Sequence, residues 1–264
     1  MIDFHTHAFP EKIAQGALEK LSEEGGALQT YTDGTLNGVL KALDEIEEGA
    51  KGVVLPIATK PTQQASINRW AAERRTDRLE IFGSVYPGAP DALEQLEQIC
   101  AYGLKGVKLH PEYQNFFVDE ERMVPIYKKA AKLGLITVFH AGYDIGFPPP
   151  CHCTPEALRR MLPHFDGAPV VAAHFGGYMA WERVLDALCG LPLYLDTSYS
   201  YGRVIKPLAE QIVEKHGTDR VLFGSDLPWS RISDELGLVR SMKLSAGELH
   251  NILYENSARL LGWV

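Results

Sequence analysis

The sequence contains no apolar run that approaches the roughly 18 residues needed to cross a bilayer. We therefore expect no contact with a membrane. A targeting segment is not expected either, because a strand-like apolar pattern already begins at Ile2. A cytoplasmic protein is the default expectation.

Cysteine and positive charge are also scarce. Only 4 of the 264 residues are cysteines, too few for a disulfide framework in a chain of this length. Lysine and arginine number 26 against 34 acidic residues, which leaves a net charge of −8, and no basic cluster offsets it. Nucleic acid is therefore not an expected partner. A small-molecule substrate is expected instead, and association into a homo-oligomer stays open.

What the sequence does have is a regular alternation of short apolar runs with amphipathic helix patterns. Most runs are continuous in aliphatic residues, as expected of parallel strands covered on both faces. The predicted strands are 2–5, 52–56, 79–85, 106–110, 135–140, 169–174, 191–196 and 220–225. The helix pattern is clearest at 36–48 and 92–102. Thr154-Pro155 and the pair Ser245 and Glu248 carry signals for helix starts.

Eight strands alternating with helices predict an α/β protein with the (β/α)8 TIM-barrel architecture. No linker or change of composition interrupts the alternation, so a single catalytic domain over 1–264 is expected. An open doubly wound sheet is the alternative. That fold normally has a glycine-rich phosphate-binding turn after its first strand, where this chain has His5-Thr6-His7.

Histidines and one acid follow the predicted strands. In a barrel the carboxyl ends of the strands meet at one face, where active sites lie. Because side chains alternate along a strand, His5 and His7 point the same way. Their Cα atoms would be about 6.6 Å apart, so the two imidazoles could converge on one ion. The residues at this face are His5, His7, His110, His140, His174 and Asp226.

The order of these motifs resembles the amidohydrolase superfamily. The motifs are His-x-His at the first strand, His140-Ala-Gly, His174-Phe-Gly-Gly and Gly-Ser-Asp226-Leu-Pro-Trp. Within the superfamily the chain is most similar to the compact metal-dependent hydrolase branch that also contains aromatic-acid decarboxylases. The similarity runs from Ile2 to the last helix pattern at 256–262.

The resemblance implies a metal site and two catalytic residues. His5, His7, His140 and Asp226 would be the metal ligands. Asp226 would also take a proton from water, and His174 would polarise the substrate or move a proton. The implied cofactor is one Zn²⁺ ion, with Mn²⁺ as the alternative, since such an ion lowers the pKa of water toward ~7.

The number of ions depends on the residues at the end of the fourth strand. Binuclear relatives have a carboxylated lysine or a glutamate there, and this chain offers Lys108, His110 and Glu112. A charged lysine repels a metal, and carboxylation requires a pKa lowered by burial. We therefore expect a mononuclear site. Cys151-His152-Cys153 supplies too few converging ligands for a second zinc site, so its loop is expected to form part of the pocket rim.

Substrate contacts are expected from residues that follow barrel strands. The predicted ones are Lys108, His110, Tyr113, Arg203 and Arg231. The same location makes Gln114, Asn115, Ser198 and Tyr199 candidates, and Trp229 either walls the pocket or packs beneath it.

The predicted function is metal-dependent hydrolysis of an amide, lactone or ester bond in a small molecule. The alternative is decarboxylation of a small aromatic acid with the same ligands. Relatives of that kind are usually longer, with loops that build an aromatic pocket. A metal-binding protein without turnover is a third reading, but it would not need both Asp226 and His174. A cationic rim would indicate a carboxylated substrate, and an aromatic slot would favour the lyase.

Overall fold

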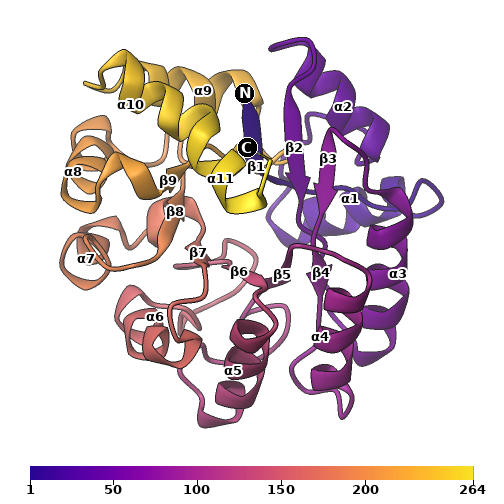
Figure 1. The fold of residues 1–264 in the computed structure, drawn as a ribbon. Coiled ribbons are helices and arrows are strands. Elements are labelled where there is room, and N and C mark those ends of the chain that lie inside the picture. The colour runs from indigo at the N-terminus through magenta and orange to yellow at the C-terminus, as the bar shows by residue number, and fades with distance from the viewer. Residues whose placement is uncertain (264) are drawn as a thin grey trace.

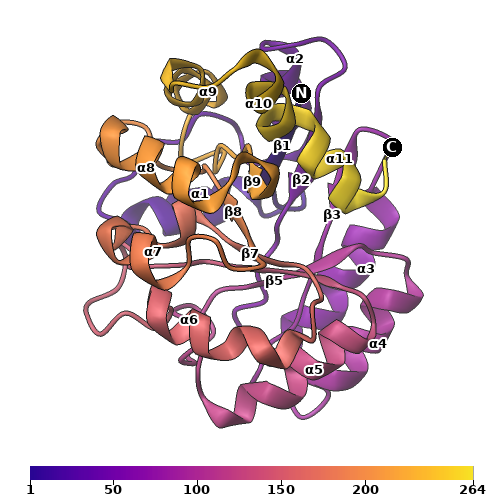
Figure 2. The ribbon, with the colours of Figure 1, turned by 60° about the vertical axis from the view of Figure 1, so that its left-hand side comes forward.

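The computed structural model describes residues 1–263 and shows a ring of short parallel strands surrounded by helices (Figures 1 and 2). The strands are β1 (Ile2–Thr6), β2 (Lys51–Val54), β3 (Leu79–Ile81), β4 (Gly83–Ser84), β5 (Gly106–Leu109), β6 (Ile136–Phe139), β7 (Val170–Ala172), β8 (Tyr194–Asp196) and β9 (Val221–Leu222).

The helices follow the strands in turn. They are α1 (Ala14–Glu24), α2 (Leu36–Asp44), α3 (Gln64–Arg74), α4 (Ala92–Ala101), α5 (Val124–Lys132), α6 (Pro155–Met161), α7 (Trp181–Ala187), α8 (Lys206–His216), α9 (Ile232–Ser241), α10 (Ala246–His250) and α11 (Asn256–Leu261). Within residues 1–263, no helix is long and apolar enough to span a membrane.

The strands form one closed barrel. The run predicted at 79–85 divides into β3 and β4 at Phe82, whose N–H donates to the Val54 carbonyl at 3.0 Å, so this run joins β2 on one side to β5 on the other. The seam closes where Phe4 N–H donates to Phe223 O and Asp226 N–H to His5 O, both at 2.8 Å. The predicted TIM barrel is therefore confirmed.

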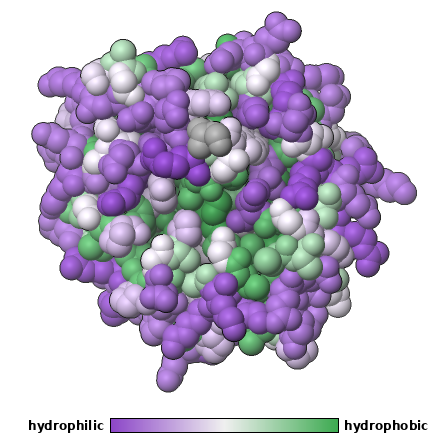
Figure 3. Space-filling view, in the orientation of Figure 1, coloured by the Kyte–Doolittle hydropathy of each residue, from purple (hydrophilic) through white to green (hydrophobic). Residues whose placement is uncertain are grey.

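An apolar cluster fills the barrel interior. It unites side chains from strands on all sides of the ring with Ala258 and Leu261 of α11, which lies across the strand ring in Figure 1. Its members on the strands and at Phe82 include Ile2, Phe4, Val53, Leu55, Phe82, Ile136, Val138, Val171 and Leu222. Hydrophilic side chains dominate the periphery of this face, and apolar ones show mainly toward its middle (Figure 3). The amino ends of the strands are thus closed by packing, and the opposite end is left for the site.

The predicted helix starts are present. Thr154 Oγ1 accepts from the Ala157 N–H at 3.2 Å, with Pro155 at the first position of α6. Ser245 and Glu248 form the reciprocal capping box that opens α10. The helix predicted at 36–48 is shorter than expected, because α2 ends at Asp44.

A bulge in β1 decides which way the histidines face. Asp3 pairs with Gly52 but Thr6 pairs with Val54, so β1 has one extra residue between these pairs. Ile2 and Phe4 belong to the interior cluster, and strict alternation would send His5 outward. The extra residue reverses the alternation, and His5 also enters the interior.

Candidate active site

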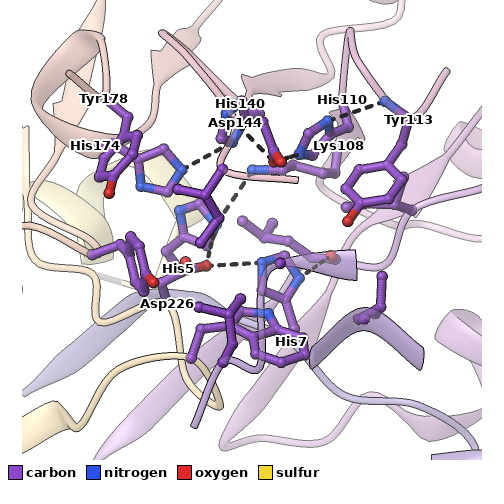
Figure 4. Close-up of a pocket in the computed structure, with 18 of the residues that line it drawn as sticks. His5, His7, Lys108, His110, Tyr113, His140, Asp144, His174, Tyr178 and Asp226 are labelled. Atoms are coloured by element: carbon purple, nitrogen blue, oxygen red, sulfur yellow. Dashed lines mark hydrogen bonds and ion pairs between the residues drawn. The ribbon is translucent and has the colours of Figure 1, made fainter. Parts of the chain in front are cut away.

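The carboxyl ends of the strands surround a pocket of about 160 Å³. Figure 4 shows the charged and imidazole side chains that meet in it. The pocket brings together all six residues expected at this face and the expected substrate contact Lys108, and adds Asp144 from the loop after β6. The seven are His5, His7, Lys108, His110, His140, His174 and Asp226.

His5, His7 and Asp226 form one group of potential metal ligands. Each offers a ligand atom within 4.8 Å of the others. Asp226 Oδ1 lies 3.0 Å from His7 Nε2 and 3.3 Å from His5 Nε2. Burial alone would raise the pKa of Asp226, but its contacts with His7 and His5 hold it below its usual value. The carboxylate is therefore ionised near neutral pH.

The hydrogen bonds of the two rings make this group fit a divalent cation. His5 Nδ1 donates to Asp196 Oδ2 and His7 Nδ1 donates to the Leu55 carbonyl, both at 2.8 Å. In the neutral rings each Nε2 therefore carries a lone pair, and that of His7 faces the Asp226 oxygen, which is also an acceptor. Two acceptors at 3.0 Å need a positive charge between them. A metal ion satisfies this geometry, and an imidazole Nδ1–H bound to a carboxylate or carbonyl is the usual support for an Nε2 ligand.

Asp196 and Ser198 connect His5 to His174. Asp196 is fully buried, and its Oδ1 accepts from the backbone N–H groups of His174 and Ser198, both at 3.1 Å. The Ser198 hydroxyl donates to the same oxygen and lies 2.9 Å from His174 Nδ1. One carboxylate at the end of β8 therefore positions both histidines.

His140 lies in a second group of potential ligands, with His110 and Asp144. Its ring stacks on that of His110 with 4.2 Å between centroids, and its Nε2 donates to the Tyr143 carbonyl at 3.1 Å. Asp144 Oδ2 lies 3.3 Å from His110 Nε2. His140 was expected to share one ion with His5 and His7. Its ring is instead turned toward the end of β5 and toward the loop that follows β6.

His140 and His174 face each other across 3.1 Å, from Nδ1 to Nε2. His174 Nδ1 lies 3.2 Å from the Ser198 carbonyl, to which it donates, so its Nε2 is the acceptor. If His140 Nε2 donates to the Tyr143 carbonyl, His140 Nδ1 also carries a lone pair, and a cation bound by both facing nitrogens would satisfy the contact. Burial lowers the pKa of His174 well below its usual value.

Lys108 extends between the two groups (Figure 4). It is 1% exposed, and its Nζ lies 3.3 Å from His5 Nε2. Burial lowers the pKa of Lys108 to about 8, against the opposing influence of Asp196 and Asp226. Burial and the neighbouring His140 lower the pKa of His110 to about 3, so that ring is neutral.

His174 and Asp226 both have positive φ angles, 60° and 70°. Side chains other than glycine rarely adopt this conformation, and where they do, the residue is often at a functional site. Hydrogen bonds hold both backbones: His174 N–H donates to Asp196, and Asp226 N–H to His5 O.

The other expected substrate contacts divide into two sets. Tyr113 and Trp229 line the pocket, and Tyr199 does so beside Tyr178. Arg203 does not line it: its guanidinium stacks 3.6 Å from the centre of the Tyr199 ring. Arg231 is exposed and packs over Tyr31 at a separate surface pocket, so its side chain lies outside this site.

The remaining candidates have structural contacts. Gln114 donates to the Ala58 and Val85 carbonyls, and Asn115 is exposed. In the loop after β6, Tyr143, Asp144 and Ile145 line the pocket. Cys151 and Cys153 belong to neither three-donor group in the described chain, and Cys151 Sγ donates to the Gly142 carbonyl.

The family model described as amidohydrolase matches residues 2–263. The chain belongs to the amidohydrolase family. No curated protein matches this amidohydrolase by sequence.

Solved structures share the fold at low identity. The 2,6-dihydroxybenzoate decarboxylase from Rhizobium is 16% identical with a TM-score of 0.69, covering 99% of this chain and 98% of its own. A putative 2-pyrone-4,6-dicarboxylic acid hydrolase from Pseudomonas putida is 16% identical with a TM-score of 0.67, covering 99% and 97%. An uncharacterised TIM-barrel protein from Bordetella bronchiseptica is 19% identical with a TM-score of 0.76, covering 99% and 98%.

Asp144 and Asp196 belong to this amidohydrolase site although neither was predicted from the sequence. Asp196 carried the same signal as the histidines that were found, since it ends a predicted strand. Asp144 carried no comparable signal, because only the conformation of the loop after β6 brings it to His110.

Proposed function

We propose that this amidohydrolase is a metal-dependent hydrolase that cleaves an amide, lactone or ester bond of a small molecule. The observation that carries the proposal is the approach of His5 Nε2 and His7 Nε2 to the same Asp226 oxygen while both Nδ1 atoms donate elsewhere. These three residues would hold the ion, with His140 as the further expected ligand. A bound Zn²⁺ or Mn²⁺ supplies Lewis acidity that acidifies water and polarises a carbonyl.

Asp226 is the proposed general base. Its carboxylate is ionised and points into the pocket, so it can take a proton from the attacking water and return it to the leaving group. His174 lines the pocket beside His140, and a hydrogen bond from one of these rings can stabilise charge that develops on the substrate oxygen. Lys108 places a further positive charge at the base of the pocket.

Decarboxylation of a small aromatic acid is the second candidate. The pocket lining favours it, because Tyr113, Tyr143, Tyr178, Tyr199 and Trp229 offer aromatic surface to a flat ring. Lys108 can neutralise a carboxylate, and one of the structures named above is a decarboxylase of an aromatic acid. The same His5, His7 and Asp226 would serve this reaction.

A side-by-side assay separates the two reactions. Purified metal-loaded protein is offered lactones, esters and hydroxylated benzoates, with acid release and CO2 release both recorded. We expect hydrolysis without CO2, and a loss of about 10²–10⁴-fold in kcat for Asp226→Asn.

Asp186→Asn is the matched control, because Asp186 is 91% exposed and, within residues 1–263, its side chain pairs only with Lys215 at the surface. CO2 release by the wild-type protein would contradict the proposed hydrolysis and would support the decarboxylase reaction. Asp226→Asn that keeps its metal and the wild-type rate would remove Asp226 from the proton path.

A further inference from the structure

A second chamber adjoins the reaction pocket. It has a volume of about 640 Å³ and lies between α1 and α3. The residues Phe9, Ile57 and Tyr113 line both spaces, so the two spaces share walls. Pockets that bury small ligands usually measure about 300–1,000 Å³, and the reaction pocket alone, at about 160 Å³, falls below this range.

The walls of this chamber are mainly apolar. Ile13, Ala17 and Leu21 come from α1 and the residue before it, and Ile67 and Trp70 from α3. Ile13 is 55% exposed, and Phe147 at the edge is 36% exposed. Burying such surface against an apolar ligand is favourable by about 25 cal/mol per Å².

The charges at its edge balance one another. Lys20 and Glu24 line the chamber and form an ion pair with each other at 3.6 Å, one turn apart on α1. The other polar side chains there are neutral, and they are Thr59, Gln63, Ser66, Trp70 and Tyr113. The chamber therefore offers no unbalanced charge to an ionised group.

We propose that this chamber binds an uncharged apolar arm of the substrate whose reacting group lies among His5, His7 and Asp226. The inference rests on the proposed site of reaction, but not on which bond is cleaved there. A substrate arm fits better than a protein segment, because the chamber is concave, shares its walls with the reaction pocket and has the volume of a small ligand.

Binding of n-alkyl carboxamides to Asp226→Asn protein, in which turnover is expected to be lost, tests the chamber separately from the reaction. Isothermal calorimetry of butanamide through decanamide should show affinity rising about threefold to fourfold per added methylene until the chamber is filled. Affinity that does not change with chain length would overturn the proposal.

Ile67→Asn places a polar group on the chamber wall at a half-buried position, which the fold should tolerate. It should remove most of the dependence on chain length and leave butanamide binding nearly unchanged. Ile205→Asn is the matched control, because Ile205 is 67% exposed and lies outside both spaces. An equal loss in both variants would contradict the assignment of the chamber.

An ester series of rising acyl length completes the test. If kcat/KM rises with length and Ile67→Asn abolishes the rise, chamber and reaction site act on one substrate. If no ester, lactone or amide is hydrolysed but amide binding still depends on length, the proposed hydrolysis fails while the chamber stands. If esters are cleaved with no dependence on length, the chamber proposal fails and hydrolysis stands.

Discussion

Asp196 serves three neighbours with two oxygens. His5 Nδ1 donates to Oδ2, and the N–H groups of His174 and Ser198 donate to Oδ1. Because the carboxylate oxygen accepts this hydrogen bond, His5 carries its proton on Nδ1 and leaves Nε2 free for a ligand. An amide in its place could donate instead and select the other tautomer.

Asp196→Asn should therefore weaken metal binding about 10–100-fold while the protein still folds, because the change affects the orientation of a ligand and not the ligand itself. Competition with a chelator of known affinity measures this. Asp186→Asn serves again as the control, and unchanged affinity in Asp196→Asn would show that His5 keeps its tautomer without the carboxylate.

The sequence predicted the side chains at strand ends and missed what loops and rotamers decide. The sequence predicted that His5, His7 and Asp226 lie together, because the end of each strand could be recognised as the end of an apolar run. The direction of the His140 ring depends on stacking against His110 and on the Tyr143 carbonyl, neither of which a strand pattern contains.

At the scale of single elements, strand β5 packs closely against the Phe82 ring. A Cβ added to Gly106 would lie 2.4 Å from the Phe82 ring and 2.5 Å from the Ile136 carbonyl oxygen. The carbonyl belongs to the backbone of the neighbouring strand, so relief would require β5 and β6 to separate.

Gly106→Ala should lower the free energy of unfolding by about 1–3 kcal/mol or more. Urea denaturation of the metal-free protein measures this. Gly16→Ala in α1 is the matched control: nothing lies within 4 Å of its added Cβ, so it should stabilise the helix by up to about 1 kcal/mol. Equal midpoints for the two variants would contradict the close approach of β5.

Helix α9 is tied to the loop after β8 through a buried acid. Glu235 is 0% exposed and accepts hydrogen bonds from the N–H groups of Ser200 and Tyr201 and from the Ser230 hydroxyl. Burial nevertheless raises its pKa from 4.5 to about 7. Between these values the folded protein binds a proton that the unfolded chain has lost, so stability falls as the pH rises from 4.5 to 7.

Glu235→Gln should flatten that part of the pH profile, removing a loss on the order of 3 kcal/mol between pH 4.5 and 7. The comparison is of slopes in urea denaturation at several pH values, since the amide also changes hydrogen bonds that do not titrate. An unchanged slope would place the pKa of Glu235 near its usual value.

The apolar pattern predicted the existence of the strands well. It predicted less well where the hydrogen bonding of each strand ends. The last run was predicted at 220–225, yet β9 contains only Val221 and Leu222. Residues beyond them bond to β1 at the barrel seam, and the irregular register caused by the β1 bulge prevents a regular ladder there. A single inserted residue leaves no signature in hydrophobicity.

For the whole molecule, the proposed metal joins distant parts of the chain. Its ligands His7 and Asp226 are 219 residues apart. An ion that binds the folded protein and not the unfolded one stabilises it by RT ln(1 + [L]/Kd), about 2.7 kcal/mol at one hundred times Kd.

Added Zn²⁺ or Mn²⁺ should therefore raise Tm by several degrees at such concentrations, and bound metal should approach one ion per chain. Asp226→Asn should reduce the rise and Asp144→Asn should not. A second ion per chain that Asp144→Asn removes would instead occupy the group of His110, His140 and Asp144.

The closing of the barrel seam also sets an order of events during synthesis. His5 and His7 leave the ribosome long before Asp226 and the segment that pairs with β1, which are translated after the other strands. On a nascent chain the two histidines are exposed without their carboxylate partner and cannot form this site. Metal binding would then follow translation of the last strand. A bound metal ion would indicate that the barrel has closed.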